Sequence, residues 1–361
     1  MSLVGLSMDA SADFRRDPGG KNAALFRALD RRYGVSEVLR PALAPHRRRL
    51  LQLAAFHPDR STWRRRFNLH PRTFAARCEV ARRMLASTSG PVVQLHTLMG
   101  NGGERPYVLH TDTNYALTER WYPEGAPLRG VERERFVELE GAVYRGAEAL
   151  FPRSAWLARS FVEDYGCEPS RVVVVGGGNN LPLLEEPGER APTALFVGVE
   201  FERKGGRELL LAWERVVAEL PHARLQVVGV PKPPRSLPPG VEWLGPVWDR
   251  ARLAELFVRA RLFVMPSIYE PWGHVFLEAM ASGLPCVGTR IGAMPEIVEH
   301  GLTGLLVPRR DPVSLALALL QLLEDADMAR SMGRAGQDRV RSGWTWDAVV
   351  DRMTPALDRL V

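Results

Sequence analysis

Short apolar runs alternate with stretches of helical spacing along this chain, and the pattern is clearest between residues 261 and 308. The run RLFVMP (261–266) is apolar and stops at a proline, which is typical of a buried strand. A polar loop follows, and apolar residues then recur at the spacing of one helix face until Gly283. The run LPCVGT (284–289) is again of the strand type. This order predicts a parallel sheet covered by helices.

The same alternation continues on either side and predicts two α/β domains. Between the two series of elements, residues 181–192 are rich in proline and acidic side chains, which is typical of a linker. We therefore predict a first doubly wound domain over residues 1–186, a second over 187–344, and a closing helix over 345–361. In the first domain, strands are expected at 3–8, 35–43, 91–100, 105–115, near 150 and near 171–178, and a helical, basic region at 46–87 broken at its prolines.

Two carboxylates flank the predicted start of a helix near His274. Glu270 lies in the polar loop, and Glu278 follows one turn into the helix. The first turn of a helix carries unpaired backbone N–H groups and a partial positive charge, which suits a phosphate. Carboxylates on either side are suited to sugar hydroxyls. The order matches a nucleotide sugar, in which a diphosphate separates a sugar from a ribose.

The residues E-P-W-G-H-V-F-L-E resemble the E-x7-E motif of retaining glycosyltransferases of family 4. The continuations A-M-A-S-G-L-P-C-V-G-T, G-A-M-P-E-I-V and G-L-T-G-L-L-V-P are similar to the same family. The resemblance implies the GT-B architecture, which has two Rossmann-like domains facing across a cleft and a C-terminal helix that packs on the first domain. It also implies that Glu270 holds the transferred sugar and Glu278 the ribose. The donor-binding residues expected on this motif are Glu270, Trp272, Gly273, His274, Val275, Phe276 and Glu278.

A second group of candidates follows the first strand of the second domain. Arg203 and Lys204 precede two glycines and a predicted helix, in a step that resembles the family's K-G loop. Arginine suits a diphosphate through a bidentate fork and lysine through a point charge. Lys204 is one of only three lysines in a chain that otherwise uses arginine, which favours a functional role for this residue over a role in solubility. The resemblance also places the nucleotide base near Val247. Trp248 is interpreted equally as a base-stacking residue or as a core or hinge residue.

In the first domain, two predicted strands each end in His-Thr, at His96 and His110. By resemblance, His110 lies beside the donor sugar and is a candidate catalytic residue, and Asp112 is a candidate acceptor-binding residue. His96 is either an acceptor-binding residue or a structural histidine. Gly19 and Gly20 precede a helix and are either an acceptor-site loop or a plain turn.

Charge is distributed unevenly. The net charge is +6, but residues 1–90 hold 18 basic and 7 acidic side chains, a surplus of 11, in clusters such as 47–49 and 64–66. Such clusters suit an anionic or lipid-linked acceptor, or the membrane surface, as well as an ordinary solvated face. No nucleic-acid-binding motif accompanies them. Three widely spaced cysteines and the absence of a leader-like N-terminus predict a cytoplasmic protein, with peripheral membrane contact as an option.

The function predicted from these observations is retaining, metal-independent sugar transfer from a nucleotide-diphospho-sugar to an acceptor hydroxyl. No cofactor is expected, because Arg203 and Lys204 supply the charge that a metal gives elsewhere. Two alternatives remain. One is an epimerase or phosphorylase-like enzyme of the same architecture, and the other is a non-catalytic sugar-binding subunit.

Overall fold

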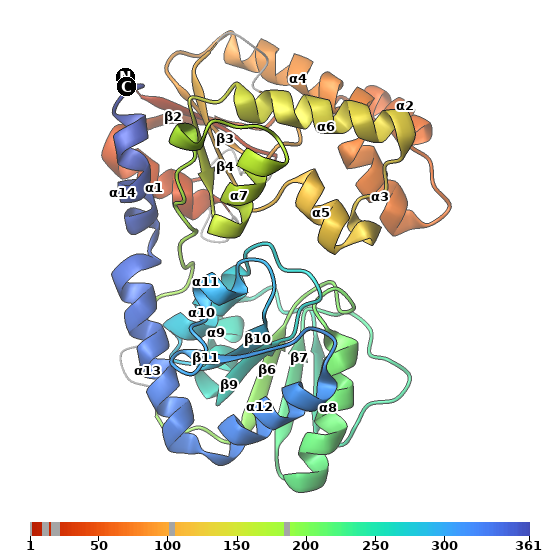
Figure 1. Ribbon diagram of the computed structural model, residues 1–361, viewed down its shortest axis with the longest axis vertical. Coiled ribbons are helices and arrows are strands. Elements are labelled where there is room, and N and C mark those ends of the chain that lie inside the picture. The colour runs from red at the N-terminus through yellow and green to blue at the C-terminus, as the bar shows by residue number, and fades with distance from the viewer. Residues whose placement is uncertain (1, 9–13, 16–21, 101–104, 184–187) are drawn as a thin grey trace. The chain divides into compact units, whose positions relative to one another are not determined.

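The computed structural model describes residues 2–8, 14–15, 22–100, 105–183 and 188–361 (Figure 1). The chain divides into two compact units. One comprises Met1–Gly176 together with Val349–Val361, and the other comprises Gly177–Ala348. The chain therefore passes from one unit to the other twice, and its last residues return to the first unit. The domain limits predicted at 186 and 344 remain predictions.

The first unit is built on a five-stranded parallel sheet in the order β2-β1-β3-β4-β5. Its strands are β1 (Leu3–Leu6), β2 (Val35–Leu39), β3 (Val92–Leu95), β4 (Tyr107–Thr111) and β5 (Ala149–Pro152). Its helices are α1 (Ala23–Tyr33), α2 (Pro45–Ala54), α3 (Arg60–Leu69), α4 (Pro71–Leu85), α5 (Tyr115–Trp121), α6 (Gly130–Arg145) and α7 (Ala155–Glu163), and α14 (Trp346–Leu357) carries the chain back to this unit.

The predicted helical region at 46–87 is confirmed as α2, α3 and α4, which are separated at its prolines. The predicted strand near 171–178 is wrong. Val173 and Val175 each donate one backbone hydrogen bond to β5, to Leu150 O at 2.9 Å and to Pro152 O at 3.0 Å. Only an isolated bridge at Val172 results, because the chain leaves the sheet edge at Gly176.

The second unit is built on a six-stranded parallel sheet in the order β11-β10-β9-β6-β7-β8. Its strands are β6 (Thr193–Val197), β7 (Arg224–Val228), β8 (Val241–Gly245), β9 (Leu262–Met265), β10 (Cys286–Thr289) and β11 (Gly304–Val307). Its helices are α8 (Gly206–Glu219), α9 (Arg250–Arg259), α10 (His274–Ala281), α11 (Met294–Ile297), α12 (Pro312–Glu324) and α13 (Ala326–Gly343).

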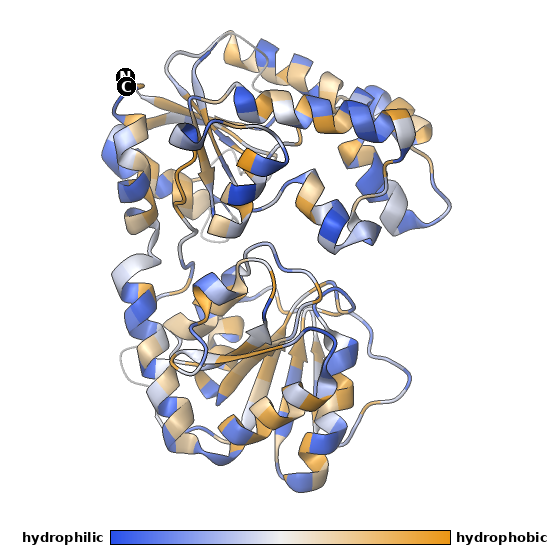
Figure 2. Cartoon of the chain, in the orientation of Figure 1, coloured by the Kyte–Doolittle hydropathy of each residue, from blue (hydrophilic) through white to orange (hydrophobic). Residues whose placement is uncertain are grey.

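Burial explains why the inner strands consist of apolar runs without alternation. Helix α8 lies beside α12, and α10 beside α13 (Figure 1). Strands β9 and β10 are buried along their whole length, and Figure 2 shows hydrophobic colours along the central strands of this sheet. Parallel sheets covered by helices on both faces have this composition. The predicted fold class, two doubly wound Rossmann-like domains, is confirmed.

The strand order fixes where each unit can bind a ligand. In the second unit the order reverses between β6 and β9, and in the first unit it reverses between β1 and β3. Ligands of doubly wound folds bind beyond the carboxyl ends of the strands at such a reversal. The loops that follow β6 and β9 carry Lys204 and Glu270. Residues distant in the sequence are therefore brought to one point of the sheet edge.

Candidate functional site

The loops after β6 and β9 are packed directly against each other. Gly205, at the start of α8, has a φ of +73°, and a Cβ built there would lie 1.9 Å from Pro266 O. Only glycine fits both this conformation and this approach. Ile268 N donates to Arg203 O at 2.9 Å. The two loops therefore form one rigid edge, and the glycine after Lys204 is explained by packing.

Lys204, Glu270 and Arg203 form a partly buried charge cluster at this edge. Lys204 Nζ donates to Glu270 Oε2, and Arg203 Nη1 lies 4.0 Å from the same oxygen. Ser267 Oγ donates to Glu270 Oε2 at 3.3 Å. The side chains of Lys204 and Glu270 are only 13% and 6% exposed. The two residues predicted for phosphate and for sugar are thus in contact.

Burial affects the charge of this cluster. It lowers the pKa of Lys204, while the neighbouring carboxylate of Glu270 opposes that shift and favours the charged ammonium. Arg203 is held by two acceptors, because its Nη1 donates to Tyr269 O at 2.9 Å and its Nε to Glu200 Oε2 at 2.7 Å. Two cations with little solvent around them are suited to an incoming dianion, since charge interactions strengthen as water is removed.

Helix α10 starts beside this cluster. Gly273 forms its N-terminal boundary with a φ of +83°, and a Cβ there would lie 2.9 Å from Met294 Cε. No side chain caps the helix start. The Phe276 ring is buried against Phe263, with centroids 5.1 Å apart, and the backbone N–H of Phe276 donates to Gly273 O at 3.0 Å. Trp272 is also buried, and its ring packs on Trp344.

Glu278, one turn into α10, is half-buried. Burial raises the pKa of its carboxyl group, while the charge of Arg250 and a hydrogen bond from the Asn180 side chain lower it. Asn180 was not among the residues predicted from the sequence. Its run of glycines and asparagines indicated only a turn.

The predicted base-binding turn follows β8. Gly245 has a φ of +67°, Val247 is half-buried, and Asp249 caps α9 by accepting from Ala251 N at 2.9 Å. Trp248 is 86% exposed, so the core interpretation of this residue is wrong. A base-stacking role for it, and a base contact at Val247, remain predictions.

In the first unit, the two His-Thr segments lie side by side at the sheet edge. His96 has a φ of +61°, an uncommon conformation for a residue other than glycine, and its N donates to His110 O at 3.1 Å. Its Nδ1 lies 3.7 Å from Asp112 Oδ1. The other Asp112 oxygen accepts from buried Arg153 at 3.4 Å. The sequence did not predict a role for Arg153 or its contact with Asp112. Gly19 and Gly20 lie outside the described residues.

The His110 ring is fully buried. Its Nε2 donates to Gly176 O at 3.0 Å, and burial, with the charge of Arg153, lowers its pKa from 6.5 to about 3. The ring is therefore neutral at physiological pH. These contacts are those of a structural histidine, and the predicted contact with a sugar requires the ring to become accessible. That contact remains a prediction.

Because His110 is buried and neutral, we expect the free energy of unfolding of the protein to depend on pH. The unfolded chain takes up a proton near pH 6.5, whereas the folded chain resists until about pH 3. The free energy of unfolding therefore falls as the pH drops below 6.5, by up to about 1.4 kcal/mol per pH unit from this group. Urea denaturation of wild type and of His110→Gln between pH 7.5 and 5 measures this fall in the free energy of unfolding. The variant should lose less stability over this range. The exposed His46→Gln is the control, and equal slopes in His110→Gln and wild type would contradict the assignment.

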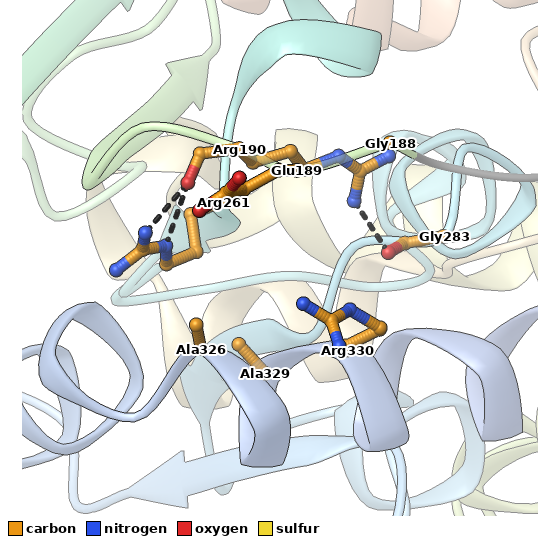
Figure 3. Close-up of a pocket in the computed structure, with 8 residues that line it drawn as sticks. All are labelled: Gly188, Glu189, Arg190, Arg261, Gly283, Ala326, Ala329 and Arg330. Carbon is orange, nitrogen blue, oxygen red and sulfur yellow. Dashed lines mark hydrogen bonds between the residues drawn. The ribbon is translucent and has the colours of Figure 1, made fainter.

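A pocket of about 20 Å³ on the second unit is lined by arginines (Figure 3). Arg190 donates to Gly283 O at 2.7 Å, Ser282 O at 2.6 Å and Val258 O at 2.9 Å. Arg261 donates to Arg190 O and Leu323 O. Apart from Arg190 O, these carbonyls lie at or near the carboxyl ends of α9, α10 and α12, where unpaired carbonyl groups favour cationic donors. The pocket is thus a structural clamp that holds the segment before β6, and not an anion site.

Comparisons with known proteins relate this geometry to a family. Residues 191–325 match the model of the family described as "Glycosyl transferases group 1". The chain is 32% identical over 247 residues to the D-inositol 3-phosphate glycosyltransferase of Geodermatophilus obscurus. That alignment covers 60% of this chain and 54% of the relative, so the chain matches about half the length of this curated relative.

Solved structures match the whole chain. A sucrose-phosphate synthase from Thermosynechococcus elongatus has a TM-score of 0.75 at 21% identity, covering 100% of this chain and 99% of the other. The Anabaena protein HepE, solved in complex with UDP and glucose, has a TM-score of 0.65 at 16% identity and covers 100% of both chains. At these identities the likeness concerns the fold, which is the predicted GT-B architecture.

Proposed function

We propose, because residues 191–325 match the model of the group 1 glycosyl transferases, that this chain transfers a sugar from a nucleotide-diphospho-sugar to an acceptor hydroxyl. The observation that carries the proposal is the contact between Lys204 and Glu270 beside the start of α10. A cation and a carboxylate that touch at the reversal of strand order suit a ligand in which a phosphate is joined to a sugar. The transferred group is a hexosyl unit, and its anomeric configuration is retained.

Each part of the site then has one role. Arg203 and Lys204 neutralise the leaving diphosphate together with the backbone N–H groups of His274 and Val275. The Phe276 N–H, which was also predicted, must first leave Gly273 O to take part. Glu270 accepts hydrogen bonds from hydroxyls of the transferred sugar, and Glu278 from those of the ribose. Charge grows on the diphosphate as the glycosidic bond breaks, and fixed cations there lower the barrier. The acceptor attacks from the face of the departing phosphate, whose oxygen takes the acceptor proton.

Transfer is proposed to be metal-independent, because two cations already face the diphosphate. Adding EDTA should leave the release of nucleoside diphosphate from the donor unchanged. Strong inhibition that Mg²⁺ or Mn²⁺ reverses would contradict this part of the proposal.

The acceptor is proposed to be anionic or lipid-linked, and the chain to work at the inner face of the cytoplasmic membrane. Helix α2 has no buried residue, and Leu50, Leu53 and Phe56 are 66%, 68% and 59% exposed. Arg48 and Arg49, which are also exposed, adjoin them. Apolar side chains rimmed by arginine suit an anionic bilayer surface. None of the described helices is both long enough and apolar enough to cross a bilayer.

Vesicle binding tests the membrane contact. Wild type should sediment with phosphatidylcholine vesicles only when phosphatidylglycerol is included. Combining Leu50→Ser, Leu53→Ser and Phe56→Ser should weaken binding by about tenfold or more, since each side chain loses apolar burial. Leu317→Ser, on α12 and 64% exposed, is the matched control. Equal binding by the triple variant and the control would contradict a role for α2.

Two other functions make different predictions. A nucleotide-sugar epimerase or a phosphorylase-like enzyme would use the same phosphate site. An epimerase would convert the donor without an acceptor, which product analysis would show. A non-catalytic sugar-binding subunit would bind the donor but release no nucleoside diphosphate. The buried Lys204–Glu270 pair favours transfer over simple binding, because maintaining a desolvated charge pair costs stability.

Thermal unfolding with added nucleotides tests the function directly. UDP, GDP, ADP and their sugars are compared. At a hundred times its dissociation constant, a true ligand adds about 2.7 kcal/mol to the free energy of unfolding. One nucleoside diphosphate should raise the melting temperature clearly above the others. If none of them does, the proposal is wrong.

A further inference from the structure

The two passages of the chain between units meet the start of α10 within the second unit. The first passage enters at Gly177 and the second leaves at Ala348. A Cβ built at Gly177 would lie 2.7 Å from Trp272 Nε1, and one at Gly178 would lie 2.5 Å from the Trp346 ring. These glycines are therefore required because the chain passes very close to the aromatic side chains beside the candidate donor site.

Aromatic rings hold the second passage against α10. The rings of Trp272 and Trp344 lie 5.2 Å apart, and those of His274 and Trp346 lie 5.7 Å apart. Asn179 N donates to Trp344 O at 2.7 Å. Both passages are thus fixed to the same helix end and to each other.

The orientation of the Asn180 amide follows from its neighbours. Trp346 Nε1 donates to Asn180 Oδ1 at 2.9 Å, and an indole nitrogen can only donate. The oxygen of the amide is therefore occupied by Trp346, which leaves the NH₂ group for an acceptor. That acceptor is the carboxylate of Glu278, for which the Asn180 side chain is a hydrogen-bond partner. The result is an ordered relay from Trp346 through Asn180 to Glu278.

We propose that Asn180 is a positioning residue for ribose recognition, which holds the Glu278 carboxylate in place while Trp346 locks the amide. The inference rests on the proposed function, since it assumes that Glu278 accepts the ribose hydroxyls. A carboxylate held by one fixed donor has its remaining lone pairs directed at a ligand, and preorganisation of this kind increases affinity. A free carboxylate would instead lose side-chain freedom on binding.

The relay predicts a specificity that can be measured. On the proposed function, Glu278 accepts the ribose 2′-hydroxyl and 3′-hydroxyl, so the relay should favour ribonucleotides over 2′-deoxyribonucleotides. The probes are the nucleoside diphosphate that stabilises wild type most and its 2′-deoxy form, with dissociation constants measured by calorimetry. Wild type should prefer the ribose form by about tenfold, as expected for a hydrogen bond to a charged group.

Asn180→Ala should reduce that preference to near unity, mainly by weakening binding of the ribose form. Trp346→Phe, which keeps a ring but removes the indole donor, should give an intermediate preference. The matched control is Asn179→Ala, because the Asn179 side chain bonds only to Leu181 among the contacts described. The control should keep the wild-type preference.

Three outcomes separate the possibilities. Equal weakening of both probes in Asn180→Ala would show a merely structural role and overturn the inference. An unchanged preference in Asn180→Ala and Trp346→Phe, or a wild type that binds both probes equally, would overturn it as well while leaving the proposed function intact. A wild type that binds no nucleoside diphosphate would refute the proposed function and this inference together.

Discussion

Replacing Lys204 with alanine is expected to lower turnover of the donor by about a hundredfold, the loss typical of removing one group that stabilises charge in a transition state. Arg203→Ala is expected to have an effect of similar size. Lys204 is the more buried of the two and contacts Glu270 directly, whereas Arg203 is also held by Glu200 and Tyr269. Initial rates of nucleoside diphosphate release, at saturating donor, measure the effect.

A matched control distinguishes a catalytic role of Lys204 from the general effect of removing one positive charge. Lys232→Ala removes the only other described lysine, which is exposed in the proline-rich loop before β8, and should leave turnover unchanged. Lys204→Ala also leaves the Glu270 carboxylate buried without its closest partner, which destabilises a fold. Melting temperatures of each variant are therefore measured with and without nucleoside diphosphate. Wild-type turnover in folded Lys204→Ala and Arg203→Ala would remove these residues from the mechanism.

Glu270→Ala and Glu278→Ala are expected to have different effects, the first on sugar transfer and the second on nucleotide binding. Glu270→Ala should abolish transfer while nucleoside diphosphate still binds nearly as it does to wild type, since this carboxylate is proposed to hold the transferred sugar and not the nucleotide. Glu278→Ala should weaken the nucleotide itself by about tenfold or more, the value of hydrogen bonds to a charged group. Calorimetric titration with nucleoside diphosphate and donor turnover are measured on the same preparations.

The control for both variants is Glu202→Ala. This glutamate lies in the same loop as Lys204, but its side chain is 69% exposed and pairs with Arg207. It should behave as wild type in both assays. If Glu270→Ala lost nucleotide binding and Glu278→Ala kept it, the assignments of the two carboxylates would have to be exchanged.

The candidate donor-binding residues could be predicted from the sequence because each of the two loops contains a recognisable local motif. Glycines follow Lys204, and the E-x7-E pattern spans Glu270. Their contact was not predicted, since it depends on β6 and β9 being neighbours in a sheet whose strand order the sequence does not state. Lys204 and Glu270 are 66 positions apart in the chain, so no local sequence pattern links them.

Residues that act across the structure were missed for the same reason. Asn180 lies in a run of glycines and asparagines whose local chemistry indicates only a turn, and its partners Glu278 and Trp346 are far away in the sequence. Apolar residues also led to two wrong interpretations of local structure. The valines at 172–175 are typical of a strand, yet they make only two backbone hydrogen bonds to β5. The exposed Trp248 was equally consistent with core packing on sequence alone.

Glu270 and Glu278, on either side of the start of α10 and opposed by Arg203 and Lys204, are proposed to hold a nucleotide-diphospho-sugar. A crystal structure of the protein with its preferred donor is the decisive experiment. We expect the diphosphate against Arg203 and Lys204, the sugar hydroxyls on Glu270 and the ribose on Glu278. A donor bound elsewhere, with these four side chains touching only each other and solvent, would contradict it.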